Sequence, residues 1–286
     1  MLEINGYTLY QNEPNTIVPG GRVYTKVIRF NTDNDFKDRL IRVYLPSTYD
    51  FDNKEKRFPV LYMFDGKNLF DDYTSFVGEW RVDEIIEDFI SQKLFEGVIV
   101  VGIDAPNTNK DRTLEMALPN MHFRKQVKRP EYGYADKLVD YLFNIVKPDI
   151  DQTFNTLSDK KNTGVGGSSM GGLMAYYTAV AAKDKLDYAL CFSPAFFLYK
   201  EKEFMEDFVK PTSKDLPRIY LYVGGVGFES VFVKQTEKVY KYLKSAGYKE
   251  NELLFQYDSN MEHNEKAWSR YFPSALTFAF KIKKDY

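Results

Sequence analysis

The stretch TGVGGSSMGG, residues 163–172, decides how this chain folds. Its first five residues are small or apolar, as in a short buried strand, and a helix-forming run begins at Met170. Within the stretch, Gly167, Ser169 and Gly171 form one G-x-S-x-G pattern. We therefore predict a strand that turns sharply into a helix, with Ser169 at the turn.

Such a turn suits a serine nucleophile. It lifts the hydroxyl out of the sheet, and it tolerates only small residues two positions away on either side. The first amides of the following helix then face any oxyanion formed there, so we expect the Met170 amide to be one oxyanion donor. Ser168 fits less well, because Met170 stands where its second glycine would be. The alternative interpretation is a glycine-rich turn whose serine only caps the helix.

Strand-like and helix-like segments alternate on both sides of this turn. Two opening segments, 22–30 and 40–45, indicate an antiparallel pair. Strands buried on both faces are then expected at 59–64 and 97–103, and further strands at 188–192, 218–223 and 252–257. Helices are expected at 82–93, 134–146, 231–245 and from about 265 onward. The fold class is therefore α/β. We expect one domain over residues 1–286, with a mostly parallel sheet of about eight strands, antiparallel at its N-terminal edge, and helices on both faces.

A serine nucleophile needs a base, and the chain has only two histidines. His263 follows the last predicted strand and comes after Ser169, which is the order expected when serine, acid and histidine follow one another along the chain. We therefore predict His263 as the base. Its alternative is a surface histidine in an acidic loop. His122 precedes Ser169 in a polar loop and is interpreted as a loop residue; a place at the substrate entrance is its alternative.

The acid that orients His263 is sought after a strand between the serine and the histidine. Glu229 is the first carboxylate after the predicted strand 218–223, and we favour it. Its alternative role is a favourable charge at the start of the following helix. Asp258, which also follows a strand, is the second candidate.

A second oxyanion donor is expected after the central strand 59–64, where the sequence continues Asp65-Gly66-Lys67-Asn68. Gly66 permits a close approach, so the Gly66 or Lys67 amide is the predicted donor. The alternative is a simple Asp-Gly turn. Residues 104–131 form a long polar segment that indicates a lid or binding loop, or disorder.

Composition excludes several classes of protein. The chain has 39 Lys and Arg against 41 Asp and Glu, a net charge of −2, which argues against a nucleic-acid partner. One cysteine, Cys191, permits no internal disulfide and no cysteine metal cluster. The start has no signal-peptide pattern, and no run approaches the ~18 apolar residues of a membrane span, so we expect a cytoplasmic protein without a membrane partner. Homo-oligomerisation stays open.

The segments RFPVLYMFDGKNLFDD, FVGEW, VIVVGIDAP, GGSSMGG, FSPAFF and EHNEKAW follow one another in the chain. In this order they resemble the "Putative esterase" (esterase D-like) family of α/β-hydrolases, over roughly residues 20–285. That family includes enterochelin esterase-like enzymes, S-formylglutathione hydrolases, and feruloyl and acetyl-xylan esterases. The resemblance implies an α/β-hydrolase fold, with Ser169 as nucleophile, His263 as base, Gly66-Lys67 as the second oxyanion turn and Trp80 near the acyl or alcohol pocket.

The segment VGGVGFE, residues 223–229, is longer than the V-G-x-x-E turn of the family, so the resemblance supports Glu229 less directly than it supports Ser169 and His263. The sequence predicts a serine carboxylic-ester hydrolase that forms an acyl-enzyme on a small, sugar-linked or aromatic ester, with no metal or organic cofactor. Three alternatives remain: an acyltransferase, an S-formylglutathione-type thioesterase, and a non-catalytic binding protein on the same fold.

Overall fold

The computed structural model describes residues 2–11, 20–32, 35–124 and 133–282. The chain divides into two compact units. Unit 1 comprises residues 1–105, 140–164 and 264–286, and unit 2 comprises residues 106–139 and 165–263. The predicted single-domain organisation stays a prediction, and each unit is described by itself.

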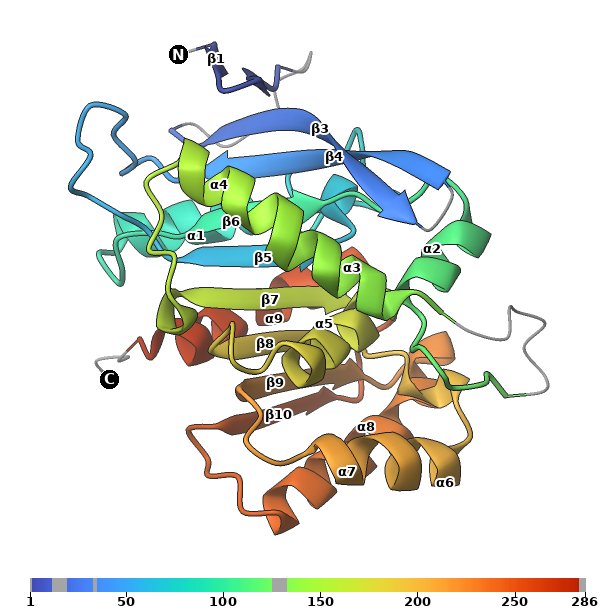
Figure 1. Ribbon diagram of the computed structural model, residues 1–286. Helices are drawn as coiled ribbons and strands as arrows, with labels where there is room; N and C mark the ends of the chain where they lie inside the picture. Colours follow the sequence, from blue (N-terminus) through green and yellow to red (C-terminus); the bar gives the residue numbers. More distant parts are fainter. Residues whose placement is uncertain (1, 12–19, 33–34, 125–132, 283–286) are drawn as a thin grey trace. The chain divides into compact units, whose positions relative to one another are not determined.

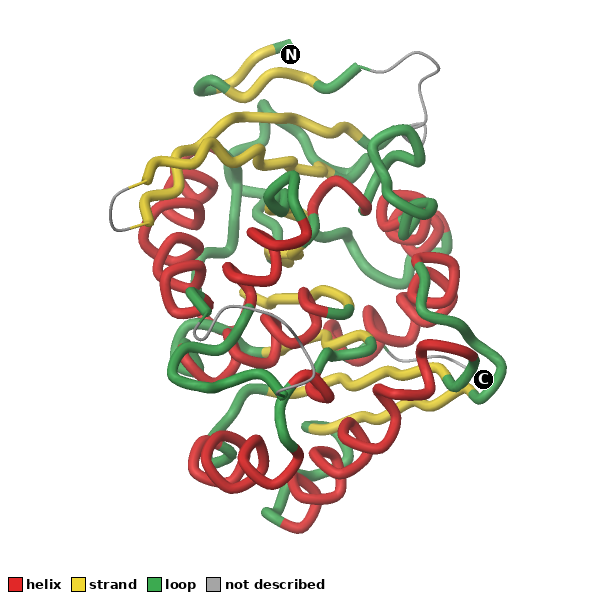
Figure 2. The backbone as a smooth tube through the Cα atoms, turned by 90° about the vertical axis from the view of Figure 1, so that its right-hand side faces the viewer, coloured by secondary structure: helices red, strands yellow, loops and turns green. Residues whose placement is uncertain are grey.

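Within the described residues, unit 1 contains six strands, hydrogen-bonded in the order β1-β2-β3-β4-β6-β5. Their bounds are β1 (Glu3–Ile4), β2 (Tyr7–Leu9), β3 (Arg22–Thr32), β4 (Asp35–Leu45), β5 (Val60–Phe64) and β6 (Ile99–Ile103). The pairs from β1 to β4 are antiparallel, β4 is antiparallel to β6, and β5 is parallel to β6. The long strands β3 and β4 lie side by side in both views (Figures 1 and 2).

The sequence of β5 and β6 explains their place inside the sheet. Every residue of VLYMF and of IVVGI is buried, so an unbroken apolar run replaces the alternation of a half-exposed strand. The helical elements of this unit are η1 (Gly66–Asn68), α1 (Val82–Ser91), η2 (Leu142–Val146), α4 (Lys147–Thr153), η3 (Lys160–Asn162) and α9 (Glu265–Phe280). Helix α1 buries its apolar face, Val82, Ile86 and Phe89, and packs against α9.

Unit 2 contains three parallel strands that lie side by side in Figure 1: β8 (Tyr188–Phe192), β9 (Arg218–Gly224) and β10 (Leu253–Asp258). Strand β7 (Thr163–Ser168) neighbours β8, and both β7 and helix α3 (Ala135–Tyr141) cross the boundary between the units along the chain. The other elements are α2 (Asn109–Met116), α5 (Met170–Ala181), η4 (Phe196–Leu198), α6 (Glu201–Glu203), η5 (Phe204–Val209), α7 (Lys210–Thr212), η6 (Gly227–Glu229) and α8 (Ser230–Ser245). Because β8, β9 and β10 are parallel, the loops that follow them emerge at one edge.

The predicted fold class is confirmed: strands of both directions combine with helices, and the antiparallel pairs lie at the N-terminal side. In the part of the chain that the structure describes, the sheet has ten strands rather than about eight, because the short strands β1 and β2 add to its edge. The segment 104–131 was expected to be irregular, but it contains α2, which the Thr108 hydroxyl caps. Residues 125–131 of that segment lie outside the described residues. Among the described helices, none has the length and apolarity needed to span a bilayer.

Candidate active site

Ser169 lies at the turn between β7 and α5, where the backbone adopts an unusual conformation. Its φ is 58° and its ψ is −117°, a region that non-glycine residues rarely occupy and that typically costs about 1–3 kcal/mol. A Cβ on Gly167 would lie 2.7 Å from the Gly171 carbonyl carbon, so these two positions meet across the turn. The G-x-S-x-G spacing is therefore a steric requirement of this turn.

The backbone of this turn is fixed to the end of β8. The Ser169 amide donates to the Phe192 carbonyl at 2.9 Å, and the Ala195 amide donates to the Ser169 carbonyl at 3.0 Å. The Ser169 side chain makes no capping hydrogen bond to α5, which argues against the capping interpretation. Ser169 is half-buried, whereas Ser168 ends β7 with only 5% of its surface exposed. Of the two serines, Ser169 is the accessible one.

Glu229 and His263 lie in direct contact. Nδ1 of His263 forms a short hydrogen bond with Oε2 of Glu229. The Glu229 side chain is fully buried, and its Oε1 accepts from the Gly224 amide at 2.8 Å and from the Ser193 hydroxyl. A buried carboxylate is tolerated when donors surround it in this way. Because an ionised carboxylate only accepts, this contact requires the proton of a neutral His263 to sit on Nδ1.

Sequence reasoning missed Ser193. It follows β8, is completely buried and has a φ of 42°, which holds its hydroxyl on the Glu229 carboxylate. Its amide donates to the Tyr222 carbonyl of β9 at 2.7 Å. Ser193 is the serine of the segment FSPAFF. Nothing local in that segment indicates that this serine contacts a carboxylate 36 residues later.

Two glycines bring the loop after β9 against the loop that carries His263. A Cβ on Gly224 would lie 2.4 Å from the Met261 carbonyl oxygen, and a Cβ on Gly225 would lie 2.8 Å from Cα of Ser259. The amides of Gly225 and Val226 both donate to the Met261 carbonyl at 3.0 Å. The glycine-rich sequence of this loop therefore sets the approach of Glu229 to His263.

The other candidates in unit 2 lie elsewhere. Asp258 ends β10, and its Oδ1 accepts from the Asn260 amide at 2.9 Å, which stabilises the turn after the strand. His122 is exposed in the loop after α2. Since Glu229 occupies Nδ1 of His263, the structure brings together the favoured acid and base of the prediction.

The predicted second oxyanion turn lies in unit 1, directly after β5. Asp65 has a φ of 61°, and Gly66 begins the short helix η1. A Cβ on Gly66 would lie 2.6 Å from the Gly102 carbonyl carbon and 2.8 Å from Oδ1 of Asp104, so only glycine fits. The first amides of a helix have no intrahelical acceptor, which leaves the amides of Gly66 and Lys67 suited to an outside oxygen.

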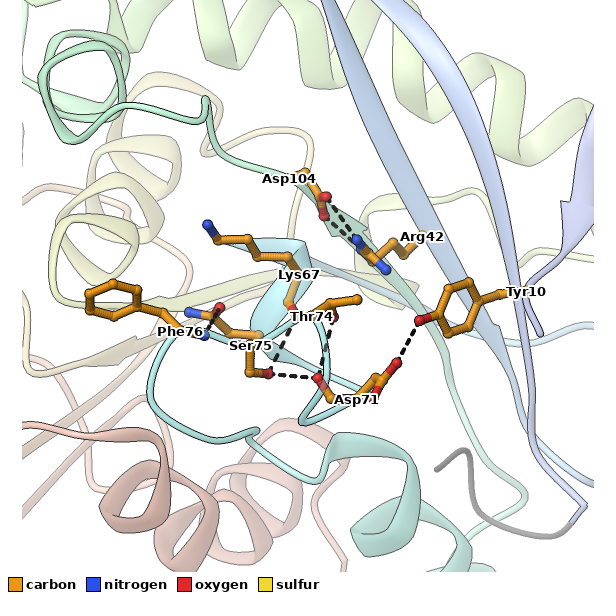
Figure 3. A network of polar contacts seen from close by, with 9 residues as sticks. Tyr10, Arg42, Lys67, Asp71, Thr74, Ser75, Phe76 and Asp104 are labelled. Carbon is orange, nitrogen blue, oxygen red and sulfur yellow. Dashed lines mark hydrogen bonds and ion pairs between the residues drawn. The ribbon is translucent and has the colours of Figure 1, made fainter. Parts of the chain in front are cut away.

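A hydrogen-bond network holds this turn in place (Figure 3). The Thr74 hydroxyl donates to the Lys67 carbonyl at 2.6 Å, and the Phe76 amide donates to Oδ1 of Asn68 at 3.3 Å. Asp71 joins the network to the start of the chain, because the Tyr10 hydroxyl donates to its Oδ2 at 2.5 Å. Several hydrogen bonds therefore connect the loop after η1 to the turn.

Beside the same turn, Arg42 and Asp104 form a buried ion pair with two hydrogen bonds, at 2.8 and 3.1 Å (Figure 3). Burial raises the pKa of Asp104, and the adjacent Arg42 guanidinium opposes that shift. The pair packs under Gly66, since Oδ1 of Asp104 is one of the atoms that exclude a side chain there.

Trp80 is 2% exposed and packs within unit 1. Its ring lies 5.7 Å from Trp268 and 6.0 Å from Phe272, both on α9, measured between ring centroids. Its amide donates to the Asn68 carbonyl at 2.9 Å, which connects it to the turn. The predicted contact of Trp80 with substrate stays a prediction; its packing gives it a structural role.

One group of carboxylates has the spacing of a metal site. Ligand oxygens of Glu79, Asp83 and Glu84 lie within 4.8 Å of one another. Burial, followed by the nearby Glu84 and Asp72 carboxylates, raises the pKa of Glu79 to about 8. A protonated Glu79 lowers the repulsion within this group.

A mixed α/β sheet with a strained serine turn and a histidine–carboxylate pair after its strands defines an α/β-hydrolase. The profile of the family described as "Putative esterase" matches residues 36–278. The chain therefore belongs to this esterase family.

The individual proteins that this chain resembles have low sequence identity to it. The chain is 21% identical over 259 residues to the uncharacterized protein YbbA of Bacillus subtilis (strain 168), covering 85% of this chain and 93% of YbbA. A ferulic acid esterase structure is similar with a TM-score of 0.66 at 17% identity, over 92% of this chain and 99% of the other. The siderophore hydrolase EstB from Aspergillus nidulans has a TM-score of 0.65 at 19% identity, over 91% and 96% of the two chains. These two structures share the fold.

Proposed function

We propose that this esterase-family protein is a serine hydrolase that cleaves carboxylic esters through an acyl-enzyme. Oγ of Ser169 attacks the ester carbonyl carbon while Nε2 of His263 accepts its proton. The tetrahedral oxyanion then collapses, the bond to the alcohol oxygen breaks, and His263 protonates the departing alcohol. Water repeats these steps on the acyl-enzyme and releases the carboxylic acid and free Ser169.

The observation that carries this proposal is the contact between Glu229 and His263. Three hydrogen bonds fix the Glu229 carboxylate, so it holds the proton of His263 on Nδ1. Nε2 then has a lone pair available for the proton of Ser169. When His263 becomes positively charged, the same buried carboxylate stabilises it.

Two amides are proposed as the oxyanion donors, as the sequence predicts. Met170 is the first residue of α5, where the amides lack intrahelical acceptors and the helix dipole favours negative charge. The Gly66 or Lys67 amide is the proposed second donor. Removing one such donor typically costs about 10²–10³ in kcat.

The substrate is proposed as a small, sugar-linked or aromatic ester, in keeping with the ferulic acid esterase and the siderophore hydrolase of similar fold. Acyl transfer to an alcohol other than water remains the second candidate on the same residues. Cys191 is not the nucleophile in this proposal, because it is buried and burial raises the pKa of its thiol. An S-formylglutathione-type thioesterase that uses Ser169 is a further alternative on the same residues. The cytoplasmic location stays a prediction.

Labelling with a fluorophosphonate tests this proposal, because the reagent modifies activated serines. The wild-type protein should be labelled and should hydrolyse p-nitrophenyl acetate, and Ser169→Ala should lose both properties. Ser168→Ala is the matched control and should keep its labelling. Labelling that persists in Ser169→Ala would refute the assignment, and an unlabelled, inactive wild-type protein would favour the binding-protein alternative.

A further inference from the structure

Two phenylalanine rings, Phe228 and Phe232, contact His263, and a third, Phe197, packs on both of them. We call these three residues the aromatic cluster. Phe232 stacks on the imidazole with ring centroids 4.4 Å apart and an angle of 24° between the planes. Phe228 meets the imidazole edge-on, at 5.4 Å and 81°. Phe197 contacts both other rings, at 6.0 Å from Phe228 and 4.6 Å from Phe232.

The members of this cluster differ in exposure. Phe232 is 1% exposed and belongs to the core, whereas Phe228 exposes 61% of its surface. Two neighbours of Phe228 are also apolar and exposed, Val226 at 37% and Val231 at 44%. Single exposed apolar residues are common on proteins, but several together beside a histidine indicate a binding surface.

The backbone that carries the exposed side chains is held by hydrogen bonds. Gly227 has a φ of 59°, which reverses the chain between Val226 and Phe228. The Val226 amide donates to the Met261 carbonyl at 3.0 Å, and the Val226 carbonyl accepts from the Glu229 amide at 3.1 Å. The positions of Val226 and Phe228 are therefore fixed by the loop that fixes Glu229. A loop whose backbone is already fixed binds a ligand without the cost of ordering that backbone.

The geometry around His263 indicates which half of an ester this surface meets. Glu229 occupies Nδ1, so Nε2 is the atom that delivers a proton to the alcohol oxygen in the proposed reaction. Rings in contact with the imidazole thus lie next to the path of the alcohol as it leaves.

Resting on the proposed function, we infer that Val226 and Phe228, backed by Phe197, bind the alcohol half of the substrate. The exposed carbon surface suits an alcohol with an aromatic or branched apolar group, and the exposed face of Phe228 suits stacking or edge contacts with an aromatic ring. Among the proposed substrates, this surface favours an ester of an apolar alcohol over an ester whose alcohol half is a sugar.

The test compares two butyrate esters, of ethanol and of 2-phenylethanol, whose alcohols have similar acidity. In Phe228→Ala, kcat/KM should fall about 10-fold or more for the phenylethyl ester and less than about 3-fold for the ethyl ester. Phe228→Leu, which keeps apolar surface, should restore part of the selectivity. Ile145→Ala is the control, because Ile145 is 48% exposed on η2 in unit 1 and should leave both rates unchanged.

An equal loss on both esters would overturn the inference, because it would mean that Phe228 only positions His263. Unchanged rates would also overturn it. So would a loss that follows the acyl half when ethyl 3-phenylpropionate replaces ethyl butyrate.

Binding of 2-phenylethanol to Ser169→Ala protein, measured by saturation-transfer NMR, examines the same surface without turnover. The signal should disappear in the Ser169→Ala/Phe228→Ala double variant, and an unchanged signal would contradict the inference. Failure of the proposed function is distinguishable, because it would show as ester turnover that survives Ser169→Ala.

Discussion

Replacing Glu229 by glutamine isolates the orientation of His263 from the rest of the site. The two side chains have nearly the same size and shape, and Glu229 is fully buried, so the packing around it should persist. The substitution replaces one of the two acceptor oxygens of the carboxylate by a nitrogen that donates, since an amide carries one acceptor oxygen and one donor nitrogen.

The surroundings determine how this amide would lie. Oε1 of Glu229 faces two donors, the Gly224 amide and the Ser193 hydroxyl, so the amide oxygen belongs there. The amide nitrogen then faces Nδ1 of His263 and donates to it. The imidazole proton must move to Nε2, and Nε2 can no longer accept the proton of Ser169.

The expected loss is large. A carboxylate-to-amide change in the corresponding position of a serine protease triad lowers kcat by about 10⁴, which corresponds to about 5.5 kcal/mol at the transition state. We expect a similar loss in kcat for Glu229→Gln, with KM little changed, because no substrate contact is removed. Ser193→Ala removes only one of the hydrogen bonds to the carboxylate and should cost about 10-fold.

The assay is steady-state hydrolysis of p-nitrophenyl acetate, with thermal unfolding as a check on folding. Asp258→Asn is the matched control, because it alters the other carboxylate that follows a strand, and it should stay within about 3-fold of wild type. A folded Glu229→Gln protein with a rate within 10-fold of wild type would refute the reasoning. A large loss in Asp258→Asn instead would transfer the acid role to that residue.

Three further substitutions test other parts of the structure. Gly224→Ala would push a Cβ to 2.4 Å from the Met261 carbonyl oxygen; kcat should fall at least about 100-fold, and wild-type kinetics would contradict that packing. Glu79 has a pKa of about 8 in the folded protein against an ordinary 4.5, so the folded state retains a proton that the unfolded chain loses. Urea unfolding should therefore show stability falling by about 1–2 kcal/mol as the pH rises from 4.5 to 8, after screening at this half-buried group, and Glu79→Gln should remove that contribution. Trp80→Ala should lower the free energy of unfolding by about 3–5 kcal/mol, because the cavity would open against Trp268; a loss below 1 kcal/mol would exclude the packing role.

The parts of the fold that the sequence predicted best are those with local causes. The runs of β5 and β6 are apolar throughout because both faces are covered, and the turn at Ser169 requires glycines at fixed spacing. Glu229 could be placed near His263 because parallel strands deliver their following loops to one edge of a sheet. Each of these inferences uses only the order of residues along the chain.

Other features depend on contacts that the sequence does not encode locally. Ser193 follows β8, and its hydroxyl donates to Glu229, which follows the neighbouring strand β9. No spacing rule along the sequence predicts that contact. The helical segment from α6 to α7 was missed because π-helical η5 interrupts its periodicity. Phe228 looks like an ordinary core residue until the turn at Gly227 exposes it.

The most direct test of the central claim is to find the covalent intermediate. Wild-type protein mixed with p-nitrophenyl acetate, quenched within milliseconds and digested, should give one peptide that carries an acetyl group on Ser169. The modification should accumulate with the burst of p-nitrophenol and should be absent from Ser169→Ala protein. Ester turnover with no acetylated peptide, or with the acetyl group on another residue, would contradict the account.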